Sequence, residues 1–118
     1  MKIALLISGI IELLGGIVCY LHPELLFSQG NPMLYRMYGL SASVIGIITI
    51  LLFRFYAENK LHRLSYITLM FFHGALAMII YSSSPEFINY KLGGTLTHLL
   101  LFVIFLMGYL QDLKPDIK

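Results

Sequence analysis

The feature that most constrains this chain is a long apolar run near its start that carries one acid at its centre. Residues 3–21 read IALLISGIIELLGGIVCYL, and Glu12 is the charged residue among them. About 20 helical residues, each rising ~1.5 Å, match the ~30 Å hydrocarbon core of a bilayer. The run therefore predicts a transmembrane helix with Glu12 near the midplane. An ionisable group at that depth is costly, so Glu12 is a functional candidate that needs a partner.

The composition of the whole chain supports a membrane protein. Of 118 residues, 58% are hydrophobic and 12% are charged, which is too apolar for a soluble domain of this length. The length leaves room for a single membrane domain, residues 1–118. The net charge of +2 is too small to indicate nucleic-acid binding. Cys19 is the single cysteine, which excludes an intrachain disulfide and a Cys-x-x-Cys redox pair.

Four apolar segments are separated by polar or turn-forming residues. They predict helices over about 3–21, 33–53, 64–82 and 92–110. Pro23 ends the first segment, and Asn31 with Pro32 forms a cap and first turn for the second. We expect the first segment to be retained rather than cleaved, because Glu12 interrupts it and no small-x-small site follows. The predicted fold class is all-α, a bundle of four transmembrane helices.

The distribution of lysine and arginine predicts the orientation. With four spans, both termini and the middle loop lie on one side, and that side holds most of the basic residues: Lys2, Arg54, Lys60, Arg63, Lys114 and Lys118. The other side holds Lys91, with Arg36 just inside the second helix. The positive-inside rule therefore places both termini in the cytoplasm. We expect an integral protein of a bacterial cytoplasmic (inner) membrane.

Each predicted helix contributes one ionisable residue to a common depth. These are Glu12, Arg36, His73 and His98, which fall between the midplane and the outer leaflet. Glycines at three- and four-residue steps share the faces of Glu12 and Arg36, and small residues mark the face that meets another helix. We therefore expect Glu12 and Arg36 to point into the bundle as partners. The layer predicts a polar pocket that opens outward.

This pocket defines the expected ligand and partners. The expected ligand-binding residues are Glu12, Arg36, His73, His98, Ser43, Tyr38 and Thr95. Arg36 and the histidines suit a small amphipathic or anionic molecule, such as a quinone or a lipid head group. Beyond such a quinone we expect no cofactor. The expected partners are the bilayer, the lipophilic ligand, and a membrane-protein partner or a second copy, but no nucleic acid. In the alternative, the four residues form a polar plug that fixes helix register and binds nothing.

Metal binding and catalysis are not expected. Glu12, His73 and His98 are legitimate ligands for zinc or iron. However, no His-x-x-His or Glu-x-x-His spacing is present, the ligands would come from three helices, and Arg36 would oppose a cation. No nucleophile elbow, phosphate loop or dinucleotide fingerprint occurs either, so we expect a binding protein, or an accessory or assembly subunit, rather than an enzyme.

Two families share parts of this pattern. The motifs SGIIELLGG and LHPELL, with a second span of the form R-x-x-G-x-x-x-S-x-x-G, resemble the DoxX-like superfamily of small four-helix membrane proteins. That resemblance implies a compact four-helix bundle with Glu12 and Arg36 as inward-facing polar positions. Some relatives are associated with quinone-linked oxidation or with the assembly of other membrane proteins.

The second family is the small multidrug resistance transporters, which are of similar length and have a membrane-embedded glutamate in the first span. Glu12 would match the acid that binds proton and drug there. Against this resemblance, the chain has no tryptophan and carries Arg36, His73 and His98 within its spans. A proton-coupled exporter that uses Glu12 is therefore the alternative function.

Overall fold

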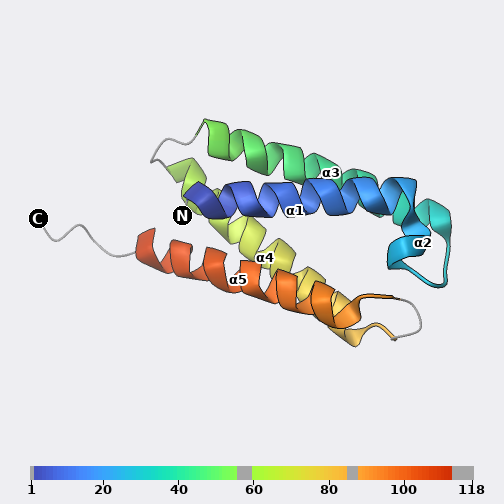
Figure 1. Cartoon of the computed structure of the whole chain (residues 1–118). Coiled ribbons are helices and arrows are strands. Elements are labelled where there is room, and N and C mark those ends of the chain that lie inside the picture. Colours follow the sequence, from blue (N-terminus) through green and yellow to red (C-terminus); the bar gives the residue numbers. More distant parts are fainter. Residues whose placement is uncertain (1, 56–59, 85–87, 113–118) are drawn as a thin grey trace, which may run out of the picture.

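The computed structural model describes residues 2–55, 60–84 and 88–112. Its helices are α1 (Lys2–Leu21), α2 (Pro23–Leu26), α3 (Pro32–Arg54), α4 (Lys60–Ser82) and α5 (Lys91–Asp112) (Figure 1). The four long helices are each long and apolar enough to cross a membrane. The predicted all-α, four-helix membrane protein is therefore confirmed, and the predicted helix bounds agree within a few residues.

Proline and asparagine set the helix boundaries at the connection between α1 and α3. Pro23 does more than end α1, because it occupies the first turn of the short helix α2, where its missing N–H is not needed. Asn31 caps α3 as expected, since its side chain accepts a hydrogen bond of 2.9 Å from the N–H of Met33. Pro32 follows in the first turn of that helix.

The long helices form two antiparallel hairpins, α1 with α3 and α4 with α5 (Figure 1). The backbones of the two hairpins lie farther apart than the backbones within each hairpin. At the end where α2 lies, the hairpins are joined by an antiparallel bridge between Phe27 and Ile88 and by the hydrogen bond from the N–H of Asn89 to the carbonyl of Leu26.

Glycines bring α1 and α3 into close contact. A Cβ on Gly16 would lie 2.6 Å from the carbonyl oxygen of Gly39, and one on Gly46 would lie 2.8 Å from that of Gly9. The two glycines on each helix are seven residues apart, so both pairs meet along one seam. Glycine allows this approach because it has no side chain to keep the two backbones apart. Small residues are common where membrane helices pack closely.

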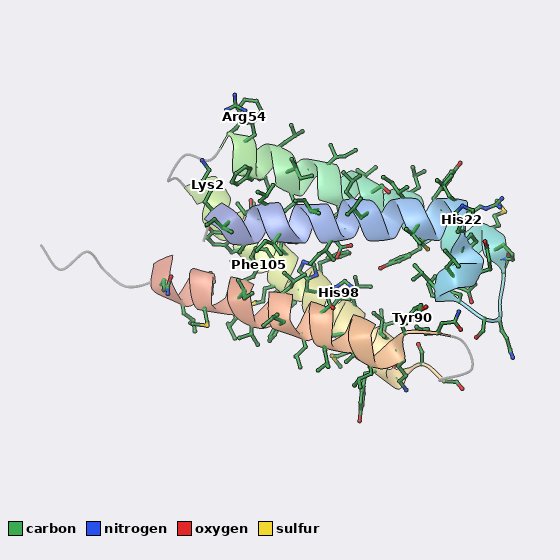
Figure 2. All side chains as sticks on the ribbon, viewed as in Figure 1. Lys2, His22, Arg54, Tyr90, His98 and Phe105 are labelled. Carbon is green, nitrogen blue, oxygen red and sulfur yellow. The ribbon has the colours of Figure 1, made fainter. Side chains whose placement is uncertain are left out.

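Large side chains fill the space between the hairpins near the start of α1. This core consists of Ala4, Leu5, Tyr66, Leu69, Leu101 and Phe105. Figure 2 shows Phe105 between the hairpins, while Lys2 and Arg54 mark one end of the molecule and His22 the other. Large apolar side chains on the outer faces, such as Leu40 and Phe71, are exposed in the isolated chain. These faces suit contact with lipid.

Two neighbouring glycines test the seam between α1 and α3. A Cβ on Gly16 would meet the backbone nitrogen of Ser43 at 2.5 Å, whereas a Cβ on Gly15 would meet nothing within 4 Å. We expect Gly16→Ala to lower the free energy of unfolding in detergent by about 1–3 kcal/mol, because the helices must move apart. Gly15→Ala should leave it unchanged or raise it by up to about 1 kcal/mol, because alanine favours a helix more than glycine does. Equal effects of the two substitutions would contradict a close backbone contact between α1 and α3 at Gly16.

The orientation in the membrane stays a prediction that cysteine labelling can check. Cys19 is fully buried, so the native chain provides an unreactive background. In intact cells a membrane-impermeant thiol reagent should label Gln29→Cys, in the connection between α2 and α3, but not Gln111→Cys at the end of α5. The reverse labelling pattern would place both termini outside.

Candidate functional site

Three of the four predicted ionisable residues come together at the centre of the molecule. Glu12 from α1, His73 from α4 and His98 from α5 lie between the hairpins, and Figure 2 labels His98 in this position. The side chains of Glu12 and His73 are 3% and 0% exposed, and that of His98 is 12% exposed. The two hairpins therefore share one buried polar cluster, which we call the Glu–His–His cluster.

The cluster joins three atoms that can each accept a proton or a metal ion. Nδ1 of His73 lies 3.0 Å from Nδ1 of His98, so a hydrogen bond between them needs a proton on one of the two. Oε1 of Glu12 lies 3.5 Å from the first nitrogen and 3.6 Å from the second. This oxygen is buried and has no hydrogen-bond partner among the residues that the structure describes. Such an acceptor is costly to bury without a partner.

Ser8 belongs to this site but was not among the residues expected from the sequence. Its hydroxyl lies 2.9 Å from Nε2 of His73, and both side chains are fully buried. Ser8 precedes Glu12 by four residues, so both face the same side of α1. That spacing was visible in the sequence, but nothing there indicated that His73 lies opposite.

Neighbouring residues fix the orientation of the His73 ring. Phe105 stacks on it with a centroid distance of 5.7 Å, whereas His98, seven residues earlier on α5, meets its edge, with the two Nδ1 atoms 3.0 Å apart. Ser8 holds one ring nitrogen, and the other therefore faces His98 and Glu12. The orientation of the imidazole is therefore set by residues of two other helices, α1 and α5.

A groove between the hairpins leads to the cluster. Its volume is about 390 Å³, and both Glu12 and His98 line it. Most of the remaining wall is apolar or aromatic, and its residues are Ile11, Gly15, Gly16, Leu26, Phe27, Tyr35, Tyr38, Ala42, Leu76, Ile79, Ile80, Ile88, Tyr90 and Gly94. Because the walls include α2 and Tyr90, the groove runs toward the end of the molecule where α2 lies (Figure 2).

Arg36 does not take the expected inward position. Its side chain is exposed, and no ion pair joins it to Glu12 among the described residues. Its charge acts instead on Glu24 of α2. The pKa of Glu24 is held below its usual range by the hydrogen bond from its own backbone N–H, by His22 and, most weakly, by Arg36. The face of α3 that meets α1 includes Gly39, Ser43 and Gly46, and the exposed Arg36 is not part of it.

Of the other three expected ligand-binding residues, one lines the groove and two do not. Tyr38 lines the groove. Ser43 donates its hydroxyl to the carbonyl of Gly39 at 2.9 Å and packs against Gly16 in the α1–α3 seam. The hydroxyl oxygen of Thr95 is buried without a hydrogen-bond partner in the described part of the chain, and Thr95 is not among the groove residues.

Comparisons with known proteins identify no relative. No protein-family model matches the chain, and neither a curated protein nor a solved structure is significantly similar to it. The resemblances to the DoxX-like superfamily and to the small multidrug resistance transporters remain predictions.

The hydrogen bond between Ser8 and His73 can be tested by replacing two serines, Ser8 and Ser41, in separate variants. We expect Ser8→Ala to lower the free energy of unfolding by about 1 kcal/mol, because it leaves a buried ring nitrogen unpaired. Ser41→Ala is the control, since its exposed hydroxyl bonds to the carbonyl of Met37 in its own helix. Thermal unfolding in detergent measures both. A Ser8→Ala protein as stable as Ser41→Ala would argue against the bond.

Proposed function

We propose that this integral membrane protein binds an amphipathic molecule between its two helical hairpins. The apolar part would lie along the groove, and the polar head would reach Glu12 and His98. The observation that carries this proposal is the largely apolar groove of about 390 Å³ whose wall includes the carboxyl residue Glu12 and His98. Small-molecule sites combine such apolar walls with a few polar groups that fix the ligand's orientation.

The chemistry of the cluster favours a head group that donates a hydrogen bond. Because Arg36 is exposed and makes no ion pair with Glu12 among the described residues, an anionic head would meet a carboxylate without a compensating cation. A hydroxyl group would instead donate a hydrogen bond to the carboxylate of Glu12 in the groove wall. We therefore favour a quinol or a lipid-like alcohol over the anionic ligand. We also propose a bacterial cytoplasmic membrane as its location, in which the distribution of lysine and arginine would place both termini in the cytoplasm.

Two glycines that face open space allow a matched test of the groove. A Cβ on either Gly15 or Gly93 would meet no atom within 4 Å, but Gly15 lines the groove and Gly93 does not. We expect Gly15→Leu to weaken binding of a short-chain quinol by at least about tenfold, since its side chain occupies the space of one to two ligand carbons. Gly93→Leu should bind as the native chain does.

Binding can be followed by native mass spectrometry or by equilibrium dialysis in detergent. Glu12→Gln should also weaken quinol binding by about tenfold or more, because a hydrogen bond to a charged acceptor contributes about 1.5–3 kcal/mol. If neither the quinol nor a long-chain alcohol binds the native chain, the groove has no such ligand. That result would contradict the proposed function.

A second candidate function is proton-coupled export of a cationic amphiphile. The observation in its favour is that the single carboxylate of the first span reaches the groove. It predicts that a cationic amphiphile releases protons from the purified protein and that Glu12→Gln abolishes the release. Binding of a neutral quinol without proton release supports the first function instead.

A further inference from the structure

We propose that the Glu–His–His cluster is a binding site for one divalent transition-metal ion. The ligands would be Oε1 of Glu12, Nδ1 of His73 and Nδ1 of His98. These atoms lie 3.0, 3.5 and 3.6 Å apart, in the interior of the protein. This inference goes beyond the proposed function, because it rests on three side chains and needs no ligand in the groove.

The separations between the three atoms are those expected around a metal ion. With bonds of about 2.0–2.1 Å to nitrogen and oxygen, two ligands of a tetrahedral zinc ion lie about 3.3–3.4 Å apart. The observed separations of 3.0, 3.5 and 3.6 Å bracket that value. A single point about 2.0 Å from all three atoms therefore exists, which is the length of a bond to zinc.

The electrostatics of the cluster also favour a cation. A proton between the two imidazoles satisfies those two nitrogens but leaves Oε1 of Glu12 without a partner. A divalent ion would satisfy all three lone pairs at once and would neutralise the carboxylate. An inward-facing Arg36 would have opposed such a cation, but this arginine is exposed and makes no ion pair with Glu12 in the described part of the chain.

The surroundings have the features of a constructed metal site. A histidine that binds a metal through one nitrogen usually uses the other nitrogen in a hydrogen bond that fixes its orientation, and Ser8 makes that bond to His73. Phe105 stacks on the same ring. Two imidazoles and one carboxylate suit Zn²⁺, Co²⁺ or Fe²⁺ better than Mg²⁺ or Ca²⁺. Since Glu12 and His98 line the groove, the remaining coordination position would face it.

The test uses Co²⁺ and Zn²⁺ alone, with the full-length protein in detergent and no amphiphile added. The native chain should retain about one ion per chain after desalting, measured by elemental mass spectrometry, and bound Co²⁺ should show the visible absorption of a tetrahedral site. Glu12→Gln, His73→Asn and His98→Asn should each lose the ion and this absorption. His22→Ala is the control, because His22 is an exposed histidine that lies 3.1 Å from the carboxylate of Glu24.

Ser8→Ala keeps the test decisive if a ligand variant fails to fold. It retains all three ligands, and we expect about tenfold weaker binding of Co²⁺, the effect of losing a hydrogen bond to a ligating histidine. Zn²⁺ should also raise the melting temperature of the native chain and of His22→Ala, because a ligand of the folded state stabilises it. A native chain that retains no ion overturns the proposal and leaves a shared proton in the cluster. Retention by the folded ligand variants, or loss in His22→Ala alone, overturns it as well.

Discussion

A carboxylate inside a membrane protein must find its partners within the fold, and this requirement organises the centre of the molecule. Glu12 lies on the first of four apolar helices, and its side chain is buried, so little solvent can reach its carboxyl group. The groups that approach it are two imidazoles from the other hairpin. Polar contact at the cluster and apolar packing around Tyr66 and Phe105 together join the two hairpins.

The contact within the first hairpin differs from the contact between the two hairpins. In the first, glycines let the backbones of α1 and α3 touch, which buries the faces of both helices without large side chains. Between the hairpins the backbones stay farther apart, and bulky side chains fill the space at one end. At the other end the space is left as the groove. The size of the side chains between the hairpins therefore decides where this space is filled and where it is left open.

The groove and the cluster have complementary chemistry. Most residues of the groove wall are apolar or aromatic, as suits a molecule that arrives from the lipid phase, and Glu12 and His98 lie in the same wall. Ser8 and Phe105 hold His73 behind this point, so the polar end is fixed by residues that do not line the groove. A bound cation at the cluster would change its net charge from negative to positive, and hence the head group that it accepts.

The sequence by itself determined the four spans, the cap at Asn31 and the burial of Glu12, because apolar length, capping chemistry and the cost of a charge in lipid are local properties of the chain. It also placed small residues on the faces of α1 and α3 that touch. Only the tertiary structure decided that His73 and His98 approach Glu12 and that Arg36 does not. Which residues of different helices meet depends on the rotation and pairing of those helices, and four near-equal apolar segments allow several pairings. The two glycine pairs and Ser8 show the same limit of sequence-based prediction. Their spacing can be read from the sequence, but the residues that they contact are known only from the packed helices.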